Sequence, residues 1–229
     1  MAGMKSVRGI AFDAYGTLFD VYAVGALAEE LFPGKGALLA EYWRVAQIDY
    51  SRIRALCGRY RDFWALTGDA LDFAAAKLGL ALAPDQRQAL MEQYAALKAF
   101  PENLEVLQTL KGDGLKLAIL SNGTPDMLKS AVGAAGMAGV FDHILSVDAV
   151  RTFKTAPEAY QMGPDAFGCP AGEIVFVSSN GWDVCGASWF GYQSFWVNRA
   201  GNVLDRLGVS PQGEGTSLAD LPGFVAQRR

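Results

Sequence analysis

The spacing of hydrophobic residues divides the chain into two regions. Between about residue 22 and residue 99, apolar side chains recur at intervals of three and four, which is typical of amphipathic helices. From about residue 100 onward, short apolar runs alternate with helical segments. This alternation predicts a parallel sheet with helices on both faces. The helices expected in the first region span residues 41–56, 62–78 and 84–98.

One apolar run stands apart in sequence from the other predicted strands. Residues 7–12 form a predicted strand that ends at Asp13 and is followed by the turn Gly16-Thr17. The simplest arrangement is an α/β core built from residues 1–20 and 99–229, with residues 21–98 inserted as a helical cap over the strand tips. The other strands are expected at 116–120, 143–147, 173–178 and 193–197, the helices at 104–110, 127–135, 158–167 and 182–189, and loops with one weak helix at 201–229.

Composition narrows the classes of function. The 229 residues are 51% hydrophobic and 19% charged, so the chain can build a substantial core. With a net charge of −4 and no block of Lys or Arg, it lacks the features of a nucleic-acid or lipid surface. No apolar run is long enough to cross a bilayer, and no signal segment precedes the first strand. We therefore expect a cytoplasmic protein without nucleic-acid or membrane partners.

Cysteine and histidine usage argues against several kinds of site. Cys57, Cys169 and Cys185 are widely spaced and form no Cys-x-x-Cys pair, which argues against a disulfide framework or a thiolate zinc site. The single histidine, His143, excludes sites that need two. No Gly-x-Ser-x-Gly motif is present for a serine triad, so a structural or surface role is expected for His143.

Polar clusters follow four of the predicted strands. A carboxylate at a strand tip, as at Asp13, is well placed to be a nucleophile, although the same residue type also caps turns. Parallel strands end along one edge of a sheet, so the clusters are expected to meet there. Each cluster alone has an ordinary capping role, and only the joint pattern indicates a site. The clusters are Asp13, Tyr15 and Thr17; Ser121-Asn122-Gly123; Lys154 with Tyr160; and Ser178-Ser179-Asn180 with Asp183.

These motifs resemble those of the haloacid dehalogenase superfamily and, more closely, of the type II L-2-haloacid dehalogenases. The resemblance extends over nearly the whole chain and implies a Rossmann-like parallel sheet core with a helical cap inserted after the first strand. The stretches that carry it are Phe12-Asp13-Ala14-Tyr15-Gly16-Thr17-Leu18-Phe19-Asp20, Trp43-Arg44, Ser121-Asn122-Gly123-Thr124, Ser178-Ser179-Asn180-Gly181-Trp182-Asp183 and Trp196-Val197-Asn198-Arg199-Ala200-Gly201.

Two departures from the phosphatases of this superfamily favour dehalogenation. Those phosphatases carry a second aspartate two residues after the nucleophile, which protonates the leaving alkoxide; Tyr15 stands there in this chain. A halide leaves as a stable anion and needs no proton. The phosphatases also hold Mg²⁺ with acidic residues in the fourth cluster, where only Asp183 is acidic here. A Mg²⁺-dependent phosphatase with an atypical acid is the alternative, and a catalytically silent binding protein is a third interpretation.

The resemblance implies a reaction that uses no metal and no cofactor. Asp13 attacks C2 of a short (S)-2-haloalkanoic acid, and the halide leaves with inversion at C2. Water then attacks the carbonyl carbon of the aspartyl ester and releases the (R)-2-hydroxy acid. By position, Arg44 receives the halide, Lys154 keeps Asp13 charged, and Asp183 activates the water.

Other matched positions are implied to bind the substrate or support these groups. Ser121 and Asn122 match residues that hold the substrate carboxylate, and Ser178 and Asn180 match residues that support Asp183. The aromatic residues of the set could equally be core residues, and the arginine could lie on a solvated helix face. The remaining lining or supporting positions are Tyr15, Thr17, Tyr160 and Trp182.

The chain departs from the subfamily at three positions. The lysine is usually followed directly by proline, whereas Thr155-Ala156-Pro157 follows Lys154 here; Pro157 can still open the helix that carries the tyrosine. Val45 replaces a frequent glutamine, which removes a polar group near the site, and Gly181 stands where alanine is common. The resemblance also implies a homodimer, with the helical cap as a contact.

Overall fold

The computed structural model describes residues 6–229, and at its centre lies a parallel sheet with the strand order β3-β2-β1-β4-β5-β6. Every residue of β1 is buried, because this strand lies between β2 and β4 with Phe12 opposite Ile119 and Val177. The predicted fold class, an α/β fold with a parallel sheet, is confirmed. The strands are β1 (Gly9–Phe12), β2 (Lys116–Ser121), β3 (His143–Ser146), β4 (Ile174–Ser178), β5 (Gln193–Val197) and β6 (Gly213–Gly215).

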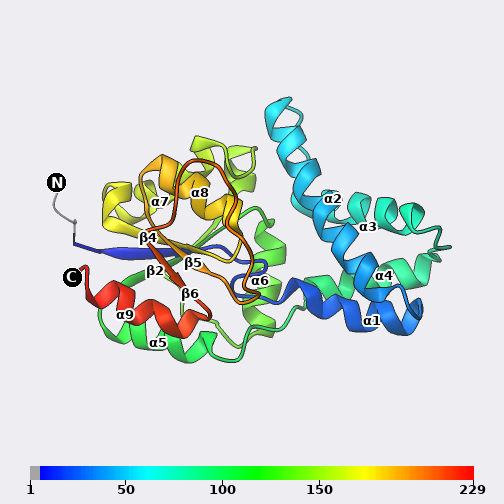
Figure 1. The fold of residues 1–229 in the computed structure, drawn as a ribbon, viewed down its shortest axis with the longest axis horizontal. Coiled ribbons are helices and arrows are strands. Elements are labelled where there is room, and N and C mark those ends of the chain that lie inside the picture. Colours follow the sequence, from blue (N-terminus) through cyan, green and yellow to red (C-terminus); the bar gives the residue numbers. More distant parts are fainter. Residues whose placement is uncertain (1–5) are drawn as a thin grey trace.

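Helices cover both faces of the sheet. Figure 1 shows α7 and α8 on one face and α5 and α9 on the other. Short 3-10 segments lie at Val21–Ala23, Val147–Val150, Ala171–Glu173 and Leu218–Asp220. The α-helices are α1 (Val24–Leu31), α2 (Gly36–Leu56), α3 (Phe63–Lys77), α4 (Pro84–Ala95), α5 (Asn103–Gly112), α6 (Pro125–Ala134), α7 (Pro157–Phe167), α8 (Gly181–Phe190) and α9 (Leu221–Ala226).

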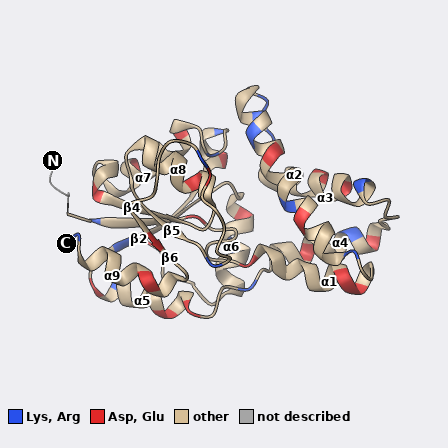
Figure 2. Cartoon of the chain, viewed as in Figure 1, with Lys and Arg blue, Asp and Glu red and all other residues tan. Residues whose placement is uncertain are grey.

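Helices α1 to α4 lie together to one side of the sheet (Figure 1). The two chain segments that connect them to the sheet run side by side: the backbone N–H of Asp20 donates to the carbonyl of Lys98 at 3.0 Å, and that of Phe100 donates to the carbonyl of Leu18 at 3.3 Å. Figure 2 shows acidic and basic residues interspersed along these helices. No helix in the part of the chain that the structure describes is long and apolar enough to cross a membrane.

The structure corrects the expectation for the C-terminal tail. Residues 201–229 contain the expected helix, α9, but they also contain β6, which pairs in parallel with β5 through residues Gly213 to Gly215. A three-residue Gly-Glu-Gly strand has no hydrophobic pattern that would predict it. In the first region, the hydrophobic spacing does not predict α1 as a separate helix. Helix α2 begins at Gly36, whereas the spacing predicts a start at residue 41.

Candidate active site

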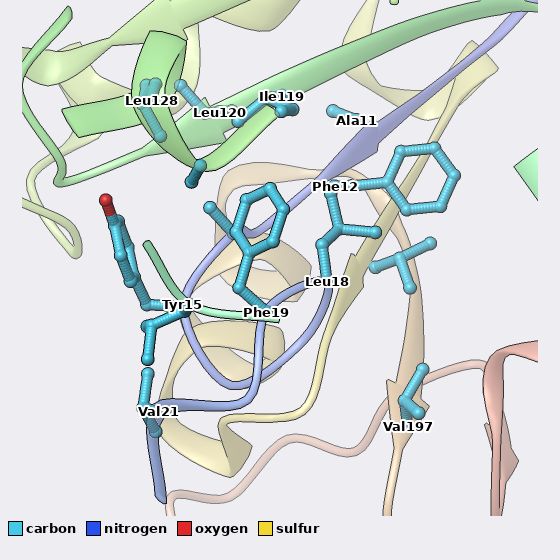
Figure 3. Packing of buried hydrophobic residues seen from close by; sticks show 14 of the residues in the cluster. Ala11, Phe12, Tyr15, Leu18, Phe19, Val21, Ile119, Leu120, Leu128 and Val197 are labelled. Carbon is cyan, nitrogen blue, oxygen red and sulfur yellow. The ribbon is translucent and has the colours of Figure 1, made fainter. Parts of the chain in front are cut away.

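The loop that follows β1, residues 13–20, is fixed to the sheet at its first residue. The backbone N–H of Asp13 donates to the carbonyl of Val177 at 2.8 Å, which continues the pairing of β1 with β4. Leu18 and Phe19 anchor the far side of the loop in the hydrophobic core (Figure 3). Gly16 has a φ of 91°, and a Cβ there would lie 3.2 Å from Ser179 Oγ, so the turn favours glycine.

The Asp13 carboxylate is 7% exposed and is held by four side chains. Its Oδ2 accepts hydrogen bonds from Thr17 Oγ1 at 3.0 Å, Ser178 Oγ at 3.2 Å and Asn180 Nδ2 at 2.9 Å. Its Oδ1 accepts one, from Lys154 Nζ at 3.0 Å. The lone pairs of Oδ2 are therefore fully used, whereas Oδ1 retains one that can form a bond.

Lys154 joins two carboxylates in the interior. Its Nζ, which is completely buried, also donates to Asp183 Oδ2 at 3.0 Å. Burial opposes the charged amine, but the attraction of Asp13 and Asp183 outweighs it and raises the pKa of Lys154. Burial also raises the pKa of Asp183, against the attraction of Lys154. The ammonium thus remains charged and fixes both carboxylates relative to one another.

Tyr160 completes the contacts of Asp183. Its hydroxyl donates to Asp183 Oδ1 at 2.7 Å, and the ring is buried on α7. Burial, followed by the charge of Asp183, raises the pKa of Tyr160 well above its usual value, so the phenol stays a neutral donor. Pro157 is the first residue of α7, as the sequence predicts. Lys154 contacts Asp13 even though the proline follows it three residues later and not directly.

Arg44 enters the site from helix α2. Its Nη2 donates to the backbone carbonyl of Tyr15 at 3.1 Å and lies 3.4 Å from Asn180 Oδ1, and its Nη1 donates to Gln47 Oε1 at 2.8 Å. The guanidinium is half-buried, so the interpretation as a solvated helix face does not hold. Val45 is 51% exposed, and the amide beside the arginine comes instead from Gln47, which the sequence analysis did not single out.

Tyr15 packs against helices α3 and α4. Its ring stacks on Tyr94 at 5.6 Å between centroids and contacts Phe63 at 6.2 Å. Its hydroxyl is buried and, within the described part of the chain, has no hydrogen-bond partner. Burial raises the pKa of Tyr15 well above its usual value, so this phenol is a poor proton donor near neutral pH.

Ser121 and Asn122 lie at the end of β2, on the same sheet edge as Asp13. The side chain of Asn122 is used inside the protein, because its Oδ1 accepts the backbone N–H of Lys154 at 3.0 Å. Ser121 Oγ accepts the backbone N–H of Gly123 at 3.1 Å. Both side chains therefore shape the loops around the lysine and the strand tip.

Trp182 contacts an arginine of α2 and lines a cavity next to Arg44. Its ring lies under the guanidinium of Arg52, 4.8 Å from the ring centroid, and so joins α8 to α2. With Arg44 and Asn180 it lines a cavity of about 450 Å³ beside the loops after β1 and β5. His143 begins β3 and packs edge-on against Phe167 at 5.9 Å, in accordance with the structural role expected for it.

The residues around Asp13 do not fit a magnesium site. Within the described residues, no group of three or more Asp, Glu, His or Cys is arranged to hold a metal ion. A hard divalent cation needs several oxygen ligands, but Lys154 Nζ lies 3.0 Å from Asp13 and from Asp183 and occupies the position between these two carboxylates. The positive charge that a metal ion would bring between the two carboxylates is supplied by the lysine ammonium.

Comparison with known proteins agrees with this geometry. The sequence family described as haloacid dehalogenase-like hydrolase matches residues 7–191. The chain belongs to the haloacid dehalogenase-like hydrolases. Among curated relatives, the (S)-2-haloacid dehalogenase of Pseudomonas sp. (strain YL) is 45% identical over 215 residues, which cover 94% of this chain and 93% of that protein.

Solved structures of this family superpose closely on the chain. An L-2-haloacid dehalogenase crystal structure has 56% sequence identity and a TM-score of 0.96, covering 97% of this chain and 100% of its own. The L-2-haloacid dehalogenase from Xanthobacter autotrophicus, solved with chloropropionic acid covalently bound, has 35% identity and a TM-score of 0.91, covering 97% and 100%. The fold and the family are thereby established.

Proposed function

We propose that this chain is an (S)-2-haloacid dehalogenase, which hydrolyses short (S)-2-haloalkanoic acids to (R)-2-hydroxy acids. The single observation that carries the proposal is the Asp13 carboxylate, with Oδ2 held by three donors and Oδ1 beside a buried ammonium. The relatives named (S)-2-haloacid dehalogenase, and the homologous structure with chloropropionic acid covalently bound, support the same reaction.

In the first step, a lone pair of Asp13 Oδ1 forms a bond to C2 while the carbon–halogen bond breaks, and the halide leaves with that electron pair. Lys154 and the donors on Oδ2 hold the carboxylate in line for this displacement, which inverts C2. Arg44 supplies a permanent positive charge for the departing anion, since guanidinium does not titrate. No proton transfer is needed.

In the second step, water attacks the carbonyl carbon of the Asp13 ester. The negative charge then develops on Oδ2, where Thr17, Ser178 and Asn180 already donate. Asp183, held by Lys154 and Tyr160, takes the water proton. The tetrahedral intermediate collapses by breaking the bond between Cγ and Oδ1. Oδ1 leaves on C2, takes the proton back from Asp183 and becomes the hydroxyl oxygen of the (R)-2-hydroxy acid. The water oxygen stays on Cγ, its remaining proton is lost to solvent, and the carboxylate of Asp13 is restored.

The substrate is held at the strand tips. The Ser121–Asn122 segment at the end of β2 would receive the substrate carboxylate through its backbone N–H groups and the serine hydroxyl. Tyr15 adds an apolar wall and a buried hydroxyl without a protein partner among the described residues. Trp182 lines the adjacent cavity with Arg44, on the side where the halide would leave.

Phosphatase activity is disfavoured by the same residues. Tyr15 has a pKa raised by burial, so it does not suit the task of protonating an alkoxide near neutral pH. Lys154 lies where the two carboxylates would otherwise share a metal ion. A catalytically silent binding protein is also disfavoured. Burying a charged lysine between two carboxylates carries a desolvation penalty, and a protein without chemistry at this position would not need such an arrangement.

We also propose that residues 21–98 act as a cap over residues 1–20 and 99–229. Tyr60, between α2 and α3, donates to Asp148 Oδ1 at 2.5 Å, and Arg52 packs over Trp182, so the two parts meet around the site. Exposed apolar residues on α2, including Ile53 at 57% and Leu56 at 88%, support a homodimer formed through the cap. The proposed location is cytoplasmic, a reducing compartment that suits the free thiols of Cys57, Cys169 and Cys185.

The experiment measures halide release from (S)-2-chloropropionate in excess EDTA, with the wild type and Asp13→Asn in parallel. Chloride release that resists EDTA and is lost in Asp13→Asn is the expected result. No chloride from the wild type, together with Mg²⁺-dependent phosphate release from a general phosphate ester, would establish the phosphatase instead. Failure in both assays would support the silent binding protein.

A further inference from the structure

A closed network of hydrogen bonds lies behind Arg44, inside the cap. Gln47 Oε1 accepts from Arg44 Nη1 at 2.8 Å and from Tyr94 Oη at 3.1 Å. Gln47 Nε2 donates to Thr67 Oγ1 at 2.7 Å, and that hydroxyl donates to the carbonyl of Phe63 at 2.7 Å. Gln47 and Thr67 are fully buried, so these partners are not replaced by water.

The network fixes which end of the Gln47 amide faces the arginine. The carbonyl of Phe63 can only accept, so the Thr67 hydroxyl must donate to it and can offer Gln47 only a lone pair. The amide nitrogen of Gln47 must therefore face Thr67. The amide oxygen is left facing Arg44, which can only donate. A flipped amide would place N–H groups against the guanidinium.

Arg44 thereby receives a neutral acceptor at the end of the guanidinium that lies away from Asn180. A carboxylate at that place would also orient the arginine, but it would neutralise the charge that the departing halide needs. An apolar residue would preserve the charge but would remove the acceptor that holds Nη1, so that only the contacts of Nη2 would orient the guanidinium. A neutral amide combines orientation at both ends with a full positive charge.

We propose that Gln47 is a positioning residue that aims the Arg44 guanidinium at the departing halide, with Thr67 and Tyr94 fixing its orientation. The inference rests on the proposed dehalogenase function. Because chloride is a poorer leaving group than bromide, its departure depends more on Arg44. Loss of the positioning should therefore slow carbon–chlorine cleavage more than carbon–bromine cleavage, whereas a merely structural defect would slow both equally.

The experiment measures single-turnover halide release from (S)-2-chloropropionate and (S)-2-bromopropionate with the wild type, Gln47→Leu and Gln47→Glu. We expect the chloride rate of Gln47→Leu to fall about tenfold to a hundredfold, and the bromide rate to fall less. Inhibition by added chloride should weaken in both variants. Gln88→Leu, which makes the same change on the exposed face of α4, is the control and should match the wild type.

Gln47→Glu keeps the test valid if the leucine variant folds poorly. It is isosteric and still accepts from Arg44, and Thr67 can turn its hydroxyl from the carbonyl of Phe63 to the new carboxylate oxygen. The proposal therefore expects a folded protein whose chloride rate and chloride inhibition both fall, because the carboxylate offsets the positive charge of Arg44. An equal fall in the release rates of chloride and bromide, or an unchanged rate in both variants, would overturn the positioning role. A wild type that releases neither halide would refute the proposed function itself, which the wild-type arm reports separately.

Discussion

Replacing Lys154 by methionine should destabilise the folded protein by about 3–5 kcal/mol near neutral pH. The side chains have similar length, but the ammonium bridges Asp13 and Asp183 at 3.0 Å each and is completely buried. Its removal leaves two neighbouring carboxylates without a counter-charge. For a chain of this size, the loss corresponds to a melting temperature lower by roughly 6–20 °C.

The pH dependence of this loss follows from the pKa shifts. The pKa of Lys154 is raised in the folded state, so its stabilisation is fully present below the unfolded value of about 10.4 and is lost as pH rises through the higher folded value. In the variant, Asp183, whose pKa burial already raises, can relieve the repulsion by taking up a proton at low pH. The difference in unfolding free energy between wild type and variant should therefore be largest near neutral pH. There Asp183 of the variant has not yet taken up a proton and Lys154 of the wild type is still charged.

The assay is chemical denaturation of both proteins from about pH 5 to about pH 9, with Lys129→Met as a control for the loss of an exposed lysine. We expect the gap in unfolding free energy to narrow towards acid and the control to match the wild type. A loss below about 1 kcal/mol, or a gap that does not change with pH, would refute the role of Lys154 as the counter-charge of the two carboxylates.

Three further changes test other contacts of the site. Tyr160→Phe removes a hydrogen bond that lowers the pKa of Asp183, so the acid limb of the kcat profile should move to higher pH; an unmoved limb would contradict the assignment of Asp183 as the base. Ser178→Ala removes one donor to Asp13 Oδ2, and ester hydrolysis should slow about a hundredfold, so that the aspartyl ester accumulates and is visible by mass spectrometry. Tyr60→Phe removes the hydrogen bond to Asp148 and should lower the unfolding free energy by about 1 kcal/mol in denaturation; an unchanged value would show that this contact does not stabilise the folded protein.

Much of the fold could be predicted because its signals are local. The apolar run before Asp13 is buried on both faces, and a strand of that kind is visible in the sequence as an uninterrupted hydrophobic stretch. β6 could not be predicted, because the residues Gly213 to Gly215 are held by pairing with β5 and not by their own pattern. Pairing between segments far apart in sequence leaves no periodicity within either one.

The residues of the candidate site likewise include some that the sequence predicts and some that it does not. Residues that follow strands, such as Asp13 and Ser178, are brought together by the rule that parallel strands end at one edge. Gln47 could not be predicted, because the partners that fix it, Thr67 and Tyr94, come from two other helices. One signal was present: Gln47 is a polar residue on the same buried face of α2 as Leu39 and Trp43.

The central claim is that Asp13, and not water, attacks C2. A single turnover of (S)-2-chloropropionate in H₂¹⁸O, with enzyme in excess, tests it directly by mass spectrometry of the product and of the peptide that contains Asp13. The account predicts unlabelled (R)-lactate and one ¹⁸O in the Asp13 carboxylate, since water attacks the ester carbonyl. Label in the lactate and none in the peptide would contradict it, because water would then have displaced the halide itself.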